Sequence, residues 1–231
     1  QFGFKQERST SLCTLLLNGI IDKFTGEGST AYVALLDMSK AFDRVNFAQL
    51  FRTMLRKNMD PIYTRCLMSF YMNQKLRVKW DDKFSPFFNV SNGVKQGGVL
   101  SPLLFCIYVD NLMQQLRLCS HGCYMGPHFA GALCYADDIV LVSPTLSGLN
   151  RMFNAQKSQF IVFRSKPDNK HVSITFDRII LQEQRSVAHL GHIIYSNPKK
   201  SDVYRILGSF YKHLISSGQS LATSHHASKR S

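Results

Sequence analysis

The stretch Ala132-Leu-Cys-Tyr-Ala-Asp-Asp-Ile-Val-Leu-Val142 places two adjacent acids, Asp137 and Asp138, inside an apolar run. Aliphatic and β-branched segments on both sides of a short break predict two buried strands joined at the acids. Two carboxylates about 4 Å apart repel by about 4 kcal/mol at an effective dielectric near 20. They therefore need protons, basic partners or metal cations. The plain alternative is a solvated turn in which the acids only cap a hairpin.

Asp37 ends a second apolar run, Ala31–Leu36. If this run lies beside the first, three carboxylates meet and form an oxygen-rich site of the kind that Mg²⁺ prefers. A second acid pair, Asp81-Asp82, offers a comparison within the same chain. It lies in a polar turn with no apolar run on its C-terminal side, so we expect it to be solvated.

Composition indicates a globular protein with a polyanionic partner. The chain has 231 residues, 45% of them hydrophobic, and a net charge of +13. That length suits one large domain or two small ones. Nine basic and three acidic residues lie in 51–100, and the same numbers in 151–200, whereas 101–150 has one base, Arg117, against three acids. Locally acidic sequence between basic segments favours a metal site flanked by phosphate-binding surfaces; solubility is the simpler explanation of the basic excess.

Six cysteines without a C-x-x-C pair, several of them in apolar runs, predict buried free thiols in a reducing compartment. Cys119, His121, Cys123 and His128 match no zinc-ligand spacing. No signal peptide is visible, and no apolar run reaches the roughly 20 residues of a membrane span, so we expect no membrane partner. Because the first residue is Gln, we expect a piece of a longer product.

Periodicity and capping signals predict an alternation of helices and strands. The expected helices are one after Ser9-Thr10 that ends at Gly26–Ser29, Phe47–Lys57, one from Pro61, one from the cap Ser101-Pro102 to Arg117, a short one within Thr145–Asn154, and 201–217. The expected strands are Ala31–Leu36, a basic hairpin of Lys75–Trp80 and Phe87–Ser91, the two around Asp137-Asp138, Ser158–Phe163, Val172–Phe176 and His189–Ile194. Asn92–Gly98 is a glycine-rich turn that lets a backbone approach a ligand closely.

Together these motifs resemble the reverse transcriptase domain of non-long-terminal-repeat (LINE-type) retrotransposons, from Gln1 to about Leu214. The order of the motifs makes the resemblance specific. They are Gln1-Phe-Gly-Phe-Lys-Gln-Glu-Arg-Ser-Thr10 (fingers), Leu36-Asp-Met-Ser-Lys-Ala-Phe-Asp43 and Gly93-Val-Lys-Gln-Gly-Gly-Val-Leu-Ser-Pro-Leu-Leu-Phe105 (first and second palm motifs), Tyr135-Ala-Asp-Asp138, Asn154-Ala-Gln-Lys-Ser158 and His189-Leu-Gly191 (primer grip).

The resemblance implies an α+β fold, a right-hand polymerase palm whose antiparallel sheet is backed by helices. It implies partial fingers in 1–30, palm in 31–60 and 93–196, an insertion with the basic hairpin in 61–92 and the start of a thumb in 197–218. The Ser-, His- and Lys-rich composition of 219–231 predicts a disordered tail. The family has a long helix where this chain has only 14 residues, Pro144 to Lys157. We therefore hypothesise a deletion near Phe153-Asn154-Ala155, which would leave part of the sheet uncovered.

The implied activity is RNA-directed DNA synthesis from deoxynucleoside triphosphates on an RNA template and a DNA primer. The implied catalytic residues are Asp37, Asp137 and Asp138, which with the Met38 carbonyl hold two Mg²⁺ ions, Mn²⁺ being possible. The implied nucleotide contacts are Phe42, Gln96, Gly97, Tyr135, Ala136 and Lys157. The implied nucleic-acid contacts are Lys5, Arg8, Arg77, His189, Leu190 and Gly191.

Each assignment has a plainer alternative. Phe42 packs equally well into a core, Lys157 and Arg77 suit an ordinary surface, and Lys5 and Arg8 suit a solvated helix start. At the level of the whole chain, the alternative function is a catalytically inactive nucleic-acid-binding remnant. A phosphodiesterase with paired Asp explains neither Gln96-Gly97 nor His189–Gly191. A nuclear or cytoplasmic location is implied by the family alone, and protein partners remain unassigned.

Overall fold

The computed structural model describes residues 1–38, 40–152, 158–165, 172–176 and 179–197. The predicted helix at 201–217, the predicted tail, Lys157 and the suspected deletion junction lie outside the described residues. The helices are α1 (Thr10–Gly26), η1 (Phe42–Arg44, 3-10), α2 (Phe47–Arg56), α3 (Pro61–Met72), α4 (Ser101–Leu118) and α5 (Leu146–Met152). The fold is α+β, as predicted.

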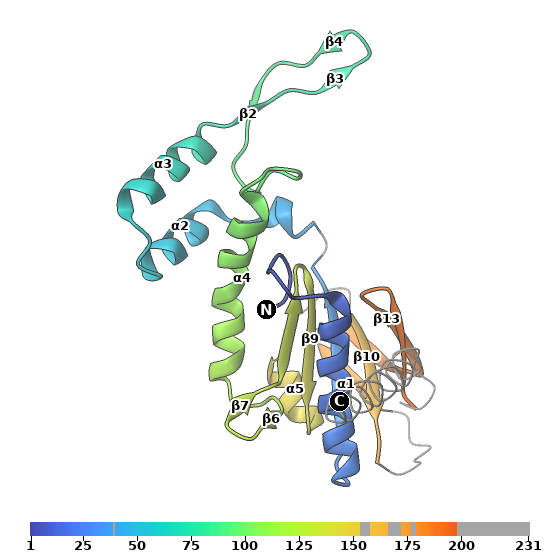
Figure 1. Ribbon diagram of the computed structural model, residues 1–231. Helices are drawn as coiled ribbons and strands as arrows, with labels where there is room; N and C mark the ends of the chain where they lie inside the picture. The colour runs from blue at the N-terminus through green and yellow to red at the C-terminus, as the bar shows by residue number, and fades with distance from the viewer. Residues whose placement is uncertain (39, 153–157, 166–171, 177–178, 198–231) are drawn as a thin grey trace, which may run out of the picture.

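A six-stranded sheet is the centre of the molecule (Figure 1). Its strands, in spatial order, are β11 (Ser173–Phe176), β12 (Ile179–Gln184), β10 (Ser158–Phe163), β1 (Ala31–Asp37), β9 (Asp138–Ser143) and β8 (Ala132–Tyr135). β1 pairs antiparallel with both β9 and β10. The prediction of an antiparallel sheet is wrong at one place, because β10 and β12 are parallel. β12 itself was not predicted.

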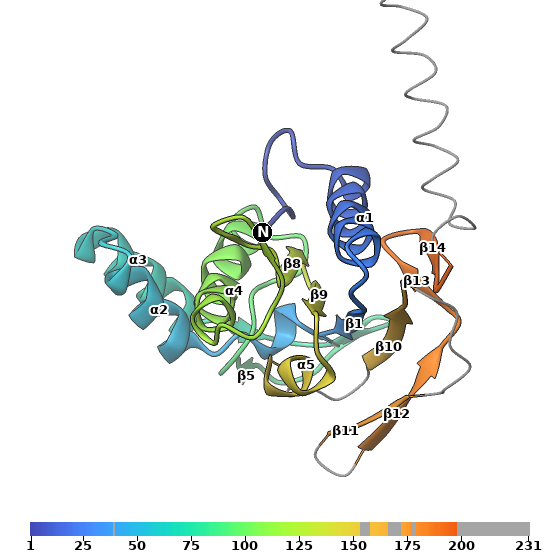
Figure 2. The ribbon, with the colours of Figure 1, turned by 90° about the horizontal axis from the view of Figure 1, so that it is seen from below.

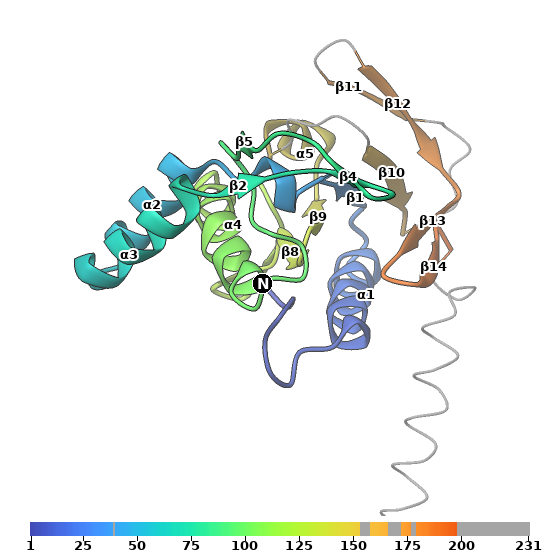
Figure 3. The same cartoon turned by 90° about the horizontal axis from the view of Figure 1, so that it is seen from above.

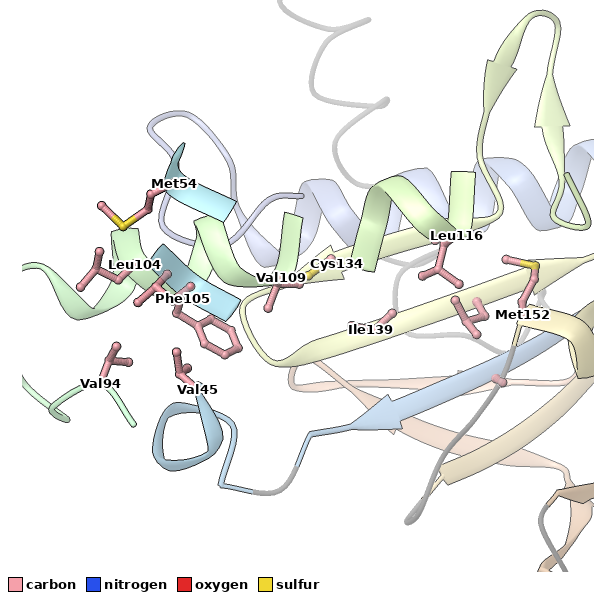
Figure 4. Close-up of a cluster of buried hydrophobic side chains, with 14 of the residues drawn as sticks. Val45, Met54, Val94, Leu104, Phe105, Val109, Leu116, Cys134, Ile139 and Met152 are labelled. Atoms are coloured by element: carbon pink, nitrogen blue, oxygen red, sulfur yellow. The ribbon is translucent and has the colours of Figure 1, made fainter. Parts of the chain in front are cut away.

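The central strands are apolar throughout because both faces of the sheet are covered. Along β1, Ala34 belongs to one buried cluster, whereas Val33 and Leu35 belong to a second cluster on the opposite face. The first cluster includes residues of α2, α4 and α5, and Figure 4 shows its interior. The second includes the inner residues of α1 (Figure 2). Burying each large apolar side chain contributes about 1.5–3 kcal/mol.

The short helix α5 makes the connection from β9 to β10, which run parallel on either side of β1. Its residues Leu149 and Met152 are buried in the first cluster, and it contacts β9, β1 and β11. The seven residues of α5 therefore cover part of the sheet surface at this crossover, whose residues 153–157 lie outside the described residues. The deletion remains a hypothesis.

Helices α2 and α3 pack against each other at one end of the molecule (Figure 3), and α2 also packs against α4. Asn46 caps α2, and Asp60 caps α3 with Pro61 in its first turn. The apolar side chains of α3 are only partly buried: Tyr71 is buried, whereas Ile62, Cys66 and Phe70 are exposed.

Beyond α3 the chain forms an extended hairpin (Figure 1). Its strands are β2 (Lys75–Leu76), β3 (Lys79–Trp80), β4 (Lys83–Phe84) and β5 (Phe88–Asn89). This hairpin confirms the predicted one, with Asp81-Asp82 exposed in its turn. A smaller hairpin, β6 (Tyr124–Met125) and β7 (His128–Phe129), precedes β8.

Two boundaries differ from the prediction. α4 begins at Ser101 with Leu100 as its N-cap, because the Ser101 hydroxyl donates to the Lys95 carbonyl (2.5 Å) instead of capping the helix. The segment predicted as one strand, His189–Ile194, is divided by a turn at Leu190-Gly191, so that His189 ends β13 (Ser186–His189) and the rest lies in β14 (His192–Tyr195).

In the part of the chain that the structure describes, no helix combines the length and apolarity needed to cross a bilayer. The six cysteines are free. Cys13, Cys123 and Cys134 are buried as expected, and burial raises the pKa of the Cys134 thiol to about 12. Cys66 is exposed, against the expectation.

Candidate active site

The three predicted catalytic acids lie at one edge of the central strands. β1 and β9 pair so that Asp37 is opposite Asp138, and β8 pairs with β9 so that Tyr135 is also opposite Asp138. Directly opposed residues of antiparallel strands project from the same face. Asp37, Asp138 and Tyr135 therefore form one row across three strands, and Asp137 lies beside them in the turn.

The row is electrostatically unfavourable without a counter-charge. Burial raises the pKa of the Asp138 carboxyl above its usual value, and the charges of Asp137 and Asp37 raise it further. Asp138 and Asp137 are half-buried, and Asp37 is exposed. Their repulsion thus acts partly out of water, where it is screened less.

The donor set fits a divalent cation in chemistry: carboxylate oxygens are the ligands that Mg²⁺ prefers, and a cation relieves the repulsion at Asp138. The positions of the side chains support a metal site less strongly than their chemical type does. Among the described residues, no three His, Cys, Asp or Glu side chains are gathered as metal ligands. Strand pairing makes the acids neighbours, but their side chains do not converge on one point as the ligands of a bound metal would.

The N-terminal segment lies against the hairpin that carries the acids. The Phe2 amide donates to the Cys134 carbonyl (2.7 Å), and the Cys106 thiol of α4 lies 3.6 Å from the Gly3 carbonyl. A Cβ on Gly3 would lie 2.3 Å from the Ala136 amide nitrogen, closer than any side chain allows. Ala136 itself has a left-handed backbone (φ 55°), which costs about 1–2 kcal/mol.

Phe42 lies between two other rings. It stacks on Phe105 of α4 with centroids 4.8 Å apart and planes at 14°, and Phe4 meets it edge-on at 6.3 Å. Phe105 is buried, Phe42 is half-buried and Phe4 is 53% exposed. Phe42 is thus held from inside the core while part of its ring remains accessible.

The glycine-rich turn is fastened to the segment that begins at Phe42. The Val94 amide donates to the Phe42 carbonyl and the Gly93 amide to the Val45 carbonyl, each at 2.8 Å. Gly93 has φ +91°, and a Cβ there would lie 2.9 Å from the Asp43 backbone, so only glycine fits.

A pocket of about 380 Å³ opens beside this turn. Its lining combines polar groups of three segments with a few apolar ones: Asp43, Gln74, Leu76, Val90, Asn92, Gly93, Val94, Lys95 and Gln96. The predicted nucleotide contact Gln96 is therefore in a pocket wall. Gly97 is exposed beside it.

A family model described as "Reverse transcriptase (RNA-dependent DNA polymerase)" matches residues 1–194. The chain belongs to the reverse transcriptase family. This match covers most of the chain and all the residues of the acid row, Phe42 and the glycine-rich turn.

Relatives of the chain come from retrotransposable elements, which confirms the resemblance to the non-LTR class. The chain is 34% identical over 136 residues to a "Retrovirus-related Pol polyprotein from type-1 retrotransposable element R2" of Nasonia vitripennis, and the match covers 59% of this chain and 13% of that protein. It is 31% identical over 138 residues to a "Probable RNA-directed DNA polymerase from transposon X-element" of Drosophila melanogaster, covering 58% of this chain and 14% of that protein.

An R2 polyprotein of Popillia japonica aligns over more of the chain, with 27% identity over 236 residues, 89% of this chain and 32% of that protein. The chain thus spans a third or less of the length of each of these three relatives.

The predicted nucleic-acid contacts of the reverse transcriptase lie in three separate places. Lys5 and Arg8 are exposed in the N-terminal segment, with the Arg8 guanidinium 5.7 Å above the Phe2 ring. Arg77 is on the extended hairpin, away from the acid row (Figure 1).

His189 is inside the fold, with 5% of its side chain exposed. Burial lowers its pKa to about 4, so it is neutral at pH 7, and its Nε2 has no partner among the described residues. The nucleic-acid contact that the resemblance implies for His189 therefore stays a prediction, and a neutral, buried imidazole would have to make it. The adjacent turn offers Leu190, half-buried against the second cluster, and exposed Gly191.

Three residues of the candidate site were not identified from the sequence. Gly3 makes the close approach to Ala136, Phe105 holds Phe42, and Lys95 shares the pocket wall with Gln96. Each lies inside a motif that the sequence analysis quoted, so the signal was present. What was missing was the knowledge of which motifs touch.

Proposed function

We propose that the chain is the catalytic palm of a retrotransposon reverse transcriptase and adds deoxynucleotides to a primer 3′ end on an RNA template. The observation that carries the proposal is the cross-strand pairing of Asp37 with Asp138, beside Asp137, in a chain of this family.

Asp37 and Asp137 are the proposed ligands of two Mg²⁺ ions, with Asp138 and the Met38 carbonyl as further oxygens. Such ions, when bound, lower the pKa of the attacking hydroxyl and neutralise the triphosphate. The protein's own part is to hold the carboxylates next to one another through the pairing of β1 with β9. Because burial and the charges of Asp137 and Asp37 raise the pKa of the Asp138 carboxyl, we assign Asp138 a secondary, tuning role.

Phe42 is the proposed sugar contact. Its stack on Phe105 restricts its ring, and a ring held in place excludes a 2′-hydroxyl better than a mobile one. Tyr135 and Ala136 complete the proposed nucleotide side of the site, because they directly precede Asp137 in the same hairpin.

The pocket beside the glycine-rich turn is the proposed position of the templating base or the incoming nucleotide, with Gln96 and Gly97 as its contacts. Lys157 remains the proposed donor of positive charge or of a proton to pyrophosphate. Lys5, Arg8 and the Leu190-Gly191 turn are the proposed contacts to primer and template.

Primer extension on an RNA template with Mg²⁺ tests the proposal, with wild type beside Asp137→Ala and Asp82→Ala. Asp82 is the matched control, since it also belongs to an Asp-Asp pair but lies in the exposed turn of the hairpin. We expect extension by wild type and Asp82→Ala and a loss of at least about 10³-fold in Asp137→Ala. Extension that survives Asp137→Ala would overturn the assignment.

A nucleic-acid-binding remnant is the second candidate, favoured by the open arrangement of the acids. Chelation separates the two. Binding by a remnant persists in EDTA, whereas nucleotide addition stops. A folded wild type that binds RNA and never extends a primer would establish the remnant.

A further inference from the structure

A groove of about 460 Å³ lies between helices α2 and α3, at the end of the molecule where these helices pack together (Figure 3). Every residue that lines the groove belongs to one of the two helices. None of these residues is a proposed catalytic residue, nucleotide contact or nucleic-acid contact. The proposed function therefore leaves this surface without a role.

The groove is apolar because both helices turn a row of apolar side chains toward it. Phe47, Phe51 and Leu55 follow one another at intervals of four residues along α2, a spacing that places side chains on one face of a helix. Phe47 and Phe51 are buried. Leu55 (49% exposed), Met68 (41%) and Met72 (55%) lie open to water in the same groove. Exposed apolar side chains that gather in one place mark interaction sites, whereas single ones are ordinary.

Two unpaired arginines accompany the apolar lining. Arg52 of α2 and Arg65 of α3 line the groove and are exposed. Among the described residues, no acid forms an ion pair with either of them. The Asp60 carboxylate accepts from the Ile62 amide as the cap of α3, and Asp110 of α4 pairs with Lys57. The groove thus combines an apolar surface with positive charge from both of its helices, which favours an occupant that is apolar in the middle and acidic at its sides.

A third helix has the shape that such a groove accepts. In the helix-in-groove mode of recognition, an amphipathic helix inserts apolar side chains at positions i, i+3 or i+4, and i+7 between two walls. Met68 and Met72 suit this mode, because unbranched methionine side chains adapt to the side chains that enter. Acidic residues on the two flanks of the helix would then reach Arg52 on one wall and Arg65 on the other.

Other occupants fit the groove less well. The rings that line it, Phe47 and Phe51, are buried, so a nucleic-acid base finds no exposed ring to stack on. A second copy that used the same groove would bring its own Arg52 and Arg65 against these arginines. A bilayer surface is broad, and the buried rings inside a groove do not reach it.

We propose that the groove between α2 and α3 binds an amphipathic α-helix of a partner protein. The apolar face of that helix enters the groove, and its acidic residues pair with Arg52 and Arg65. This docking is independent of nucleotide addition, because the groove shares no residue with the proposed catalytic site. A protein that never extends a primer would still bind the helix.

Synthetic peptides with a fluorophore at one end test the proposal. The first is about 15 residues long, about 22 Å as a helix, with leucine at every third or fourth position and glutamate on both sides of this stripe. A second peptide has lysine in place of each glutamate, and a third has the composition of the first with its leucines spread around the helix. By fluorescence anisotropy, we expect the protein to bind the first peptide at least about tenfold more tightly than either of the others.

Variants of exposed residues locate the binding. Met68→Gln removes apolar surface from the groove and should weaken binding of the acidic peptide about tenfold, whereas Leu118→Gln, at an exposed leucine of α4, should bind like wild type. Arg65→Glu should weaken binding of the acidic peptide and strengthen that of the lysine peptide, and Arg117→Glu at the end of α4 is its charge-matched control. Because all four side chains are exposed, we expect the variants to have the circular dichroism spectrum of wild type.

Equal affinities for the three peptides, or for Met68→Gln and Leu118→Gln, would overturn the proposal. Sedimentation tests the second copy: a wild type that self-associates beside a monomeric Met68→Gln would assign the groove to a contact between copies. Binding of single-stranded RNA or of anionic phospholipid vesicles that Met68→Gln abolishes, in a protein that ignores the acidic peptide, would assign the groove to that ligand instead.

Discussion

Gly3 and Ala136 are in backbone contact, although 132 positions of sequence separate them: a Cβ on Gly3 would lie 2.3 Å from the Ala136 nitrogen and 2.9 Å from its Cα. The N-terminal segment thus braces the turn that carries Asp137. The atoms in the way are main-chain atoms of the turn itself, which cannot rotate aside.

Gly3→Ala should therefore displace the segment or the turn. We expect the free energy of unfolding to fall by about 1–3 kcal/mol, the usual cost of overpacking, and primer extension to fall with it. Urea denaturation measures the first effect. Gly19→Ala is the control: nothing lies within 4 Å of its Cβ in helix α1, so it should stabilise the protein by about 0.5–1 kcal/mol. Equal behaviour of the two variants would contradict the contact.

Asp138→Asn should stabilise the protein at neutral pH. Because the pKa of Asp138 is raised in the fold, its ionised form destabilises the native state above that pKa, and the penalty disappears when pH falls below the pKa of the unfolded chain. We expect a gain of up to about 1 kcal/mol at pH 7, typical of a like-charged cross-strand pair, and none near pH 3.

Mg²⁺ supplies the complementary measurement. It should raise the melting temperature of wild type and raise that of Asp138→Asn by less, since one repulsive charge is already gone. Asp82→Asn, in the exposed turn, should respond to Mg²⁺ as wild type does. A Mg²⁺ effect that is identical in all three proteins would argue against a metal site at the acid row.

Phe105→Leu should loosen Phe42. The variant loses an aromatic stack worth about 0.5–1.5 kcal/mol and leaves the Phe42 ring less restricted. If Phe42 excludes the 2′-hydroxyl, the ratio of kcat/KM for ribonucleotides to that for deoxynucleotides should rise about tenfold. Phe51→Leu, at a buried ring that contacts Phe47 in a tilted arrangement instead, should lose stability without changing the ratio. A ratio unchanged by Phe105→Leu would assign Phe105 to packing alone.

His189 should make the protein acid-sensitive. Its pKa is lowered to about 4 by burial and by His192, from the 6.5 of an unperturbed histidine. The unfolded chain therefore takes up a proton that the folded chain refuses, and stability is lost as pH falls from about 6.5 toward 4. The loss should be about 2 kcal/mol at pH 5.

Urea unfolding of wild type and His189→Gln between pH 7 and pH 4.5 isolates this effect from the carboxylates, which titrate in both proteins. Between pH 7 and pH 5 we expect the free energy of unfolding of wild type to fall by about 2 kcal/mol more than that of His189→Gln. Parallel pH profiles would mean that His189 is accessible to protons in the native state.

The local elements were predictable because their signals are local. Apolar runs ending in Asp37 and flanking Asp137-Asp138 indicated buried strands. The alternating cations and the polar turn between 75 and 91 indicated the extended hairpin. The acids could be assigned to one site because strands of this composition pair. The row of Asp37, Asp138 and Tyr135 needed the register, which periodicity does not specify between distant segments.

The sequence by itself determined which residues are apolar, which turns need glycine and which family the order of motifs resembles. The tertiary structure decided what each segment touches: Gly3 on Ala136, Phe105 on Phe42, β12 parallel to β10, and His189 in the interior beside an exposed turn. The reason is physical. Which face of an element is buried can be read from residues within a few positions of one another, every second residue in a strand and every third or fourth in a helix. Register, stacking partners and pKa values depend on packing between segments that only the folded chain brings together.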